Sequence, residues 1–162
     1  MISKTMEEAL NRQINRELFS AYLYLSMSAY FEAIPLRGFA HWLRVQVREE
    51  TTHAEKMYSY LIKSGGRARM AAIEEPRGDW KSPLDVFLQV AAHEKAVTGL
   101  INNLVELSVR ENDTETNAML QWFVKEQVEE EENAGDVVAK IQMIGDTPAD
   151  LIMLDHHLGK RV

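Results

Sequence analysis

The sequence contains no cysteine, and its 162 residues include only eight glycines and four prolines. The absence of cysteine excludes disulfides, thiolate metal sites and rubredoxin-type iron centres, and it fits a cytoplasmic location. Because glycine and proline interrupt regular structure, their scarcity favours long helices over a turn-rich β fold. With 46% hydrophobic residues the chain can bury a core of its own, so a single domain over 1–162 is predicted.

The N-terminal stretch and the net charge bear on membrane targeting and on the charge of possible partners. The stretch MISKTMEEALNRQ has no apolar run after its first charge, so neither a signal peptide nor a membrane span is expected. The formal net charge of −7 predicts a surface that repels nucleic acid and attracts cations.

Apolar residues recur at helical spacing through most of the chain. The spacing predicts an all-α protein, with a short helix at about 148–158 that follows four long helices at about 5–33, 36–63, 83–110 and 114–144. Thr5 and Glu8 are spaced as a capping box at the first helix start. Ser82 and Pro83 suit the N-cap and first turn of the third helix.

Residues 65–81, between the second and third helices, show no sustained period. Connections between antiparallel neighbours in a bundle usually run about 2–8 residues, so this segment is far longer than such a turn needs. Extended at about 3.3 Å per residue, it could span the ~40 Å length of the second helix. We therefore expect a crossover along the bundle, with the second and third helices parallel.

On each long helix, apolar residues at helical spacing form one face, and a few positions of that face hold polar residues instead. Glu50 and His53 lie at i and i+3 of the second helix, so both project from one otherwise apolar face. The other interruptions are Glu17 in the first helix, Glu94 in the third, and Gln127 and Glu130 in the fourth. Burying unpaired charge costs several kcal/mol, about as much as a folded domain can spare. A metal ion would offset this cost, because carboxylate and imidazole on one helical face suit a hard metal.

These interruptions are expected to meet at one level of the bundle. In an antiparallel pair, residues at the same height are equidistant from the turn. The two glutamates of the first pair average to about 33.5, which is the Ile34-Pro35 turn, and the polar positions of the second average to about 111–112, beside Asn112. The four glutamates carry −4, which two divalent cations would cancel, whereas His53 neutralises one unit at most. A dinuclear metal site is therefore predicted.

Other interpretations of the same residues are open. Glu50 and His53 taken alone would also suit a buried hydrogen-bonded pair, and Gln127 either ligates a metal or bonds to a neighbouring carboxylate. The acidic run 129–132 is mostly a solvated face. A non-enzymatic helical scaffold, whose polar residues only set the register of the helices, is a further alternative.

Motifs along essentially the whole chain resemble those of prokaryotic non-haem ferritins. They are, in chain order, NRQINRELFSAYLYLSM, GFAHWLR, EETTHAEK, GGR, EEP, WFVKEQVEEE and LDHHLG. Ferritin-like di-metal bundles carry Glu on two helices and Glu-x-x-His on two more. Here the fourth helix has Gln127-x-x-Glu130 without a histidine, a departure that the non-haem ferritins share. The resemblance implies a ferritin-like four-helix bundle with a short fifth helix.

The resemblance also implies the ligands of a di-iron centre. It assigns Glu17, Glu50 and His53 to one iron, with Glu50 bridging. It assigns Glu94 and Glu130 to the second iron, with Gln127 close by.

Three further expectations follow from the same resemblance. A third iron site would map onto Glu49, Glu126, Glu129 and Glu130. Tyr24, stacked over Glu17, matches the tyrosine kept beside the centre as an electron donor. Thr52 stands where haem-binding bacterioferritins have their methionine ligand, so no haem is expected.

The activity implied is that of a ferroxidase that stores iron. Fe(II) would be oxidised by O2 or H2O2, and the ferric product stored as a mineral in a homo-oligomeric shell, a 24-mer. The apolar fifth helix agrees with a shell, because it needs a partner to bury it. The alternative is a rubrerythrin-type di-metal oxidase or peroxidase that stores nothing; the missing cysteine and missing second Glu-x-x-His motif count against it.

Overall fold

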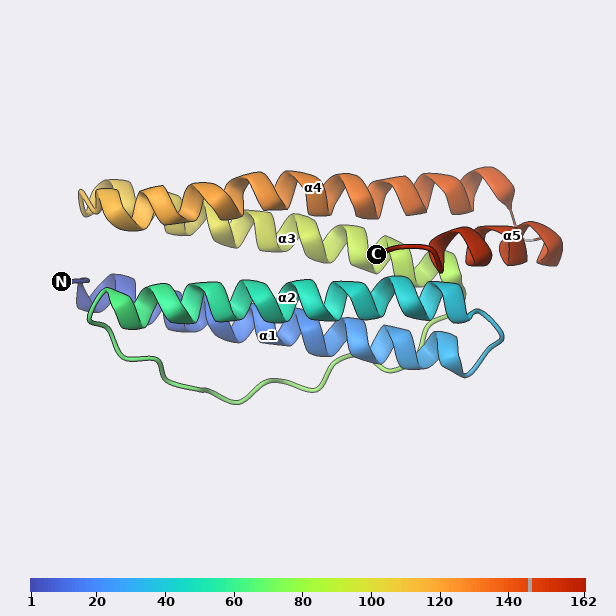
Figure 1. Cartoon of the computed structure of the whole chain (residues 1–162), viewed down its shortest axis with the longest axis horizontal. Helices are drawn as coiled ribbons and strands as arrows, with labels where there is room; N and C mark the ends of the chain where they lie inside the picture. Colours follow the sequence, from blue (N-terminus) through green and yellow to red (C-terminus); the bar gives the residue numbers. More distant parts are fainter. Residues whose placement is uncertain (146) are drawn as a thin grey trace.

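Five α-helices make up the part of the chain that the computed structural model describes, residues 1–145 and 147–162. They are α1 (Lys4–Glu32), α2 (Arg37–Lys63), α3 (Pro83–Arg110), α4 (Thr114–Ile144) and α5 (Pro148–Leu158). The four long helices lie side by side as a bundle, and α5 folds back against one end of it (Figure 1). The expected four-helix bundle with a short fifth helix is confirmed.

The segment between α2 and α3 runs along the outside of the bundle from one end to the other, so α2 and α3 are parallel (Figure 1). Three side chains of α1 donate hydrogen bonds to carbonyl oxygens of this crossover segment at successive heights. Asn11 donates to Arg67, Asn15 to Ala72, and Ser26 to Arg77. The buried ring of Trp80 anchors its far end, where Nε1 donates to Gln89. The predicted crossover is therefore confirmed. Side chains of α1 supply hydrogen-bond donors to part of the crossover backbone.

Side chains cap the starts of α1, α3 and α4. Ser82 accepts a hydrogen bond from the Asp85 amide at 3.1 Å, as expected. The predicted capping box of Thr5 and Glu8 is wrong: Ser3 is the N-cap of α1, and its Oγ accepts from the Met6 amide at 3.0 Å. Thr5 lies inside the first turn, because Ser3 satisfies the free amides two residues earlier.

Two apolar clusters fill the bundle, one on each side of its middle. One is rich in aromatic rings, among which Phe31 and Phe39 stack with centroids 4.9 Å apart. The other is mainly aliphatic and includes Leu10, Leu61 and Leu120. Each fully buried side chain of this kind contributes about 1.5–3 kcal/mol. These clusters can offset the cost of a buried polar layer between them.

The fifth helix packs closely on α2 through a small residue. A Cβ added at Gly38 would overlap the carbonyl oxygen of Asp155, and the Asp155 Oδ1 accepts a hydrogen bond from the Phe39 amide at 3.0 Å. One face of α5 is unpartnered in the subunit, since Ile152 and Met153 are 62% and 72% exposed. Across the described residues, no helix has the length and apolarity needed to span a membrane.

Candidate metal centre

The polar interruptions of the four long helices converge at the middle of the bundle. Their side chains are only 1% to 3% exposed: Glu17 from α1, Glu50 and His53 from α2, Glu94 from α3, and Gln127 and Glu130 from α4. Each lies on the inward stripe of its helix, so helical periodicity carries it into the core.

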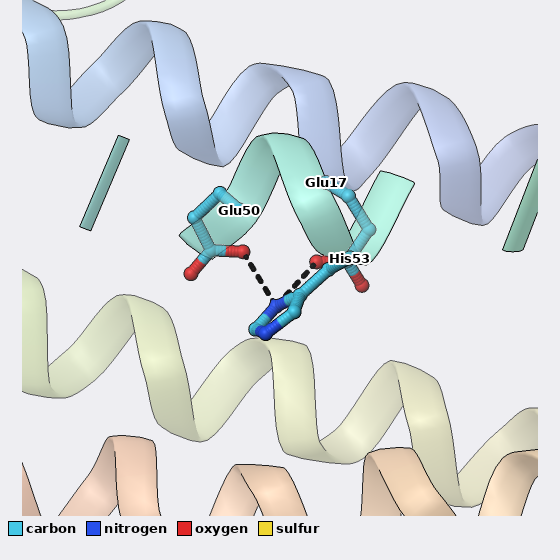
Figure 2. A group of neighbouring side chains, drawn as sticks. All are labelled: Glu17, Glu50 and His53. Atoms are coloured by element: carbon cyan, nitrogen blue, oxygen red, sulfur yellow. Dashed lines mark hydrogen bonds and ion pairs between the residues drawn. The ribbon is translucent and has the colours of Figure 1, made fainter. Parts of the chain in front are cut away.

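The first group joins α1 and α2. Ligand atoms of Glu17, Glu50 and His53 all lie within 4.8 Å of one another. His53 Nδ1 is 3.2 Å from Glu50 Oε2 and 3.8 Å from Glu17 Oε2, and both carboxylates point toward the ring nitrogen (Figure 2). Gln13 Nε2 donates to Glu17 Oε1 at 2.7 Å, which holds the outer oxygen of that carboxylate. The group offers one nitrogen and two carboxylates to a single cation.

The second group joins α2, α3 and α4. Carboxylate oxygens of Glu50, Glu94 and Glu130 lie within 4.8 Å of one another. Glu50 therefore belongs to both groups and is the only described residue shared by them, which is the position of a bridging ligand. Gln46 Nε2 donates to Glu130 Oε2 at 2.8 Å, so this carboxylate too is held from outside.

Two carboxylate oxygens in this layer have no hydrogen-bond partner among the described residues. They are Glu17 Oε2 and Glu50 Oε1, and both are fully buried. A buried acceptor left unpaired costs about 1–3 kcal/mol, and more when it is charged. Cations placed between the two groups would satisfy both atoms, so the donor set fits metal ions.

The pKa values report the same excess of buried negative charge. Burial, with smaller effects of neighbouring carboxylates, raises the pKa of Glu50 well above its ordinary value and also raises the pKa of Glu94. Burial and the charge of Glu94 raise the pKa of Glu130 to about 7. Burial lowers the pKa of His53, but the close carboxylates of Glu17 and Glu50 outweigh this effect and raise the value to about 11. The raised pKa values of these three glutamates follow from the excess of buried negative charge in the layer.

The hydrogen bond of Tyr24 goes to Glu94 rather than to Glu17, over which it was expected to stack. Its hydroxyl donates to Glu94 Oε1 on α3, and its ring is fully buried. The side chain therefore bonds across the bundle to α3 rather than along its own helix. Burial and the charges of Glu94 and Glu50 raise the pKa of Tyr24 well above its ordinary value, so the hydroxyl stays protonated.

Gln127 takes the core hydrogen-bonding role that was one of its two expected roles. Its Nε2 lies 3.2 Å from Glu94 Oε2 and 3.2 Å from Thr98 Oγ1, and donates to both. The amide therefore orients the carboxylate of Glu94 from outside.

The residues expected at a third iron site are only partly brought together. Glu126 Oε1 lies 3.6 Å from His53 Nε2, and these two form a third group with Glu130. Glu49 lines the same cavity of about 300 Å³ as His53 and Glu126, but its Oε2 pairs with Arg161 Nη2 at 3.0 Å. Glu129 is exposed and belongs to none of the three groups.

Sequence reasoning missed the residues that hold the carboxylates from outside. Gln13 and Gln46 are 4% and 1% exposed, and each lies four residues before a site glutamate of its own helix, Glu17 or Glu50. That spacing puts each glutamine on the inward face, so a search for buried amides one turn before each glutamate would have found both.

Comparison with known proteins agrees with this architecture. The family described as Ferritin-like domain matches residues 7–144. A "Bacterial non-heme ferritin" of Bacteroides fragilis (strain 638R) is 44% identical over 99% of this chain and 100% of that protein. One from Staphylococcus aureus (strain USA300) is 36% identical over 99% and 97%.

Solved structures are similar over the whole fold. A "novel open pore ferritin" from the archaeon Archaeoglobus fulgidus is 50% identical, with a TM-score of 0.99 and 100% of both chains covered. A structure described as "Humanized Archaeal ferritin" is 49% identical, with a TM-score of 0.99 over 100% of this chain and 98% of that one.

A four-helix bundle with buried carboxylates at one level defines a ferritin-like protein. The chain belongs to the ferritin family, as an iron-storage protein of the prokaryotic non-haem type.

Proposed function

We propose that this ferritin is a ferroxidase, which oxidises Fe(II) at a di-iron centre inside each subunit and stores the ferric product as a mineral. The observation that carries the proposal is the pair of buried groups that share Glu50. Glu17, Glu50 and His53 hold the first Fe(II), and Glu50, Glu94 and Glu130 hold the second.

Charge balance supports two ions rather than one. The four glutamates carry −4 when ionised, and two Fe(II) ions supply +4, so the two ions balance the carboxylates. Carboxylate oxygens are hard ligands and favour Fe(III) over Fe(II), which makes oxidation easier at this site. The two unpartnered oxygens, on Glu17 and Glu50, are available to the ions.

The electrons go to a small oxidant. Two electrons, one from each Fe(II), reduce O2 to H2O2 with two protons, or reduce H2O2 to two water molecules with two protons. Tyr24 contributes from beside the second ion: its hydroxyl bonds to Glu94, which supports a role as an additional electron donor. Gln127, on the other side of Glu94, keeps this carboxylate in place.

A third iron position lies next to the first two. Glu126 and Glu130 approach His53 from α4, and Glu49 borders the same cavity from α2, which supports an ion between these carboxylates. Glu129 stays a prediction at this position, since its exposed side chain joins no group.

Storage requires an enclosure, and we infer a homo-oligomeric shell of 24 subunits, located in the cytoplasm. The exposed apolar face of α5, at Ile152 and Met153, supports burial against other copies of the chain. The Archaeoglobus protein described as an open pore ferritin supports shell formation by a chain of this fold.

The test combines particle size with iron chemistry. Size-exclusion chromatography with light scattering would be followed by aerobic Fe(II) titration of wild type and the Glu50→Ala/His53→Ala variant, monitored by absorbance of ferric product. We expect a particle near 24 subunits that oxidises iron quickly and keeps it soluble, and a slow variant. A small oligomer that oxidises Fe(II) quickly but precipitates the iron would instead indicate a rubrerythrin-type oxidase. Equal rates in both proteins would refute the site.

A further inference from the structure

Arg161, which follows α5, is held against α2 by several contacts. Its guanidinium lies over the Trp42 ring, 4.2 Å from the centroid, and its Nη1 donates to the Trp42 carbonyl oxygen at 3.2 Å. Its own carbonyl oxygen is 2.6 Å from His41 Nε2. The side chain is only 17% exposed, so this segment is docked on the bundle.

One nitrogen of Arg161 begins a chain of hydrogen bonds that ends in the metal centre. Arg161 Nη2 donates to Gln46 Oε1 at 2.6 Å, and Gln46 Nε2 donates to Glu130 Oε2 at 2.8 Å. Gln46 and Glu130 are 1% and 3% exposed, so water does not substitute readily for either contact. The relay therefore joins the docked segment to a carboxylate of the second group.

The polarity of a primary amide makes the first of these bonds control the second. An amide has one acceptor oxygen and one donor nitrogen, related by rotation about its last torsion. While Arg161 holds the oxygen, the nitrogen of Gln46 must face Glu130. Without Arg161, the amide oxygen is a buried acceptor that lacks its donor, and only the hydrogen bond to Glu130 itself still holds the nitrogen toward the carboxylate.

We propose that Arg161 is a positioning residue of the second metal position and acts on Glu130 through Gln46. The proposal rests on the function proposed above, because it requires Glu130 to bind metal. A carboxylate whose outer oxygen is fixed presents its other oxygen to the ion without first being ordered. Removing such an outer partner typically weakens metal binding by about 10–100-fold. Arg161 is one bond further out, so we expect about fivefold for its loss.

Arg161 has a second polar partner, and the test must separate the two. The same Nη2 lies 3.0 Å from Glu49 Oε2. Gln46→Leu removes the relay and leaves the ion pair of Arg161 with Glu49, so a loss of affinity that passes through the pair would persist in this background. Lys160→Gln is the matched control for charge, because Lys160 is the exposed neighbour of Arg161.

The experiment measures Zn(II) binding to the assembled protein without oxygen or iron. Isothermal titration calorimetry gives the affinities, and anomalous scattering from crystals soaked at limiting Zn(II) shows which position each ion occupies. Light scattering and thermal unfolding establish that every variant compared is assembled and folded.

We expect Arg161→Gln to weaken the ion at Glu94 and Glu130 by about fivefold, and to leave the ion at Glu17 and His53 unchanged. Lys160→Gln should leave the affinity at the second position unchanged. Because Arg161 acts through Gln46, adding Arg161→Gln to Gln46→Leu should weaken binding no further.

The role of Arg161 would be overturned by unchanged affinity in Arg161→Gln, or by the same loss whether or not Gln46 is present. Equal weakening of both ions would also overturn it, because that indicates a general loosening of the bundle. A wild-type protein that binds no pair of ions would refute the proposed function itself, which distinguishes the two failures.

Discussion

Replacing Glu130 by glutamine should stabilise the metal-free protein while impairing its metal site. Burial and the charge of Glu94 raise the pKa of Glu130 from its ordinary 4.5 to about 7. The folded state therefore holds this proton more tightly than the unfolded state. The contribution of Glu130 to the free energy of unfolding is therefore highest below pH 4.5, falls as the pH rises toward 7, and then levels off. Ionised Glu130 thus opposes folding at neutral and alkaline pH.

The size of the effect follows from that difference. A shift of about 2.5 pKa units corresponds to about 3 kcal/mol at pH 8, and to about 1 kcal/mol at pH 5, where the carboxyl is mostly protonated in the folded state. Glutamine has nearly the same volume, and its oxygen can still accept the hydrogen bond from Gln46. For a chain of this length, about 3 kcal/mol corresponds to a rise of roughly 6–12 °C in melting temperature.

The assay is thermal unfolding of chelator-treated wild type and Glu130→Gln at pH 5 and pH 8. Glu132→Gln is the matched control, because Glu132 lies on the same helix but is exposed. The variant should gain more stability at pH 8 than at pH 5, by about 2 kcal/mol, and Zn(II) should then stabilise wild type more than the variant. A gain that does not depend on pH, or no gain at pH 8, would refute the reasoning.

Three further outcomes are expected. Gly38→Ala should destabilise the protein by about 1–3 kcal/mol, because the new methyl overlaps the Asp155 carbonyl where α5 meets α2. Chemical denaturation measures this change, and Gly99→Ala, which has open space around it, is the control. Tyr24→Phe should cost about 1 kcal/mol and slow Fe(II) oxidation, while two Zn(II) ions still bind, since the ring stays and only the hydroxyl on Glu94 is lost; an unchanged rate would remove Tyr24 from the chemistry. Ile152→Asp should reduce particle size in light scattering, because Ile152 is 62% exposed in the subunit and a shell would bury it beside other copies; an unchanged particle would place subunit contacts elsewhere.

Local patterns in the sequence were enough to predict the framework. Helical periodicity located the long helices, and the length of residues 65–81 implied the crossover, because a covalent chain must span the distance that it connects. The level of the buried glutamates also followed from sequence, since residues of a hairpin that are equidistant from its turn lie at equal heights. The geometry places Glu17, Glu50, Glu94 and Glu130 together as that argument expected.

The contacts between helices were decided only by the tertiary structure. The Tyr24 hydroxyl bonds to Glu94, and Glu49 pairs with Arg161, because the reach of a side chain across a bundle depends on helix rotation and rotamer. Neither is encoded in spacing along one helix. The relay from Arg161 through Gln46 to Glu130 joins residues more than eighty positions apart. It exists because α5 folds back and brings the residues that follow it onto α2, a path set by packing.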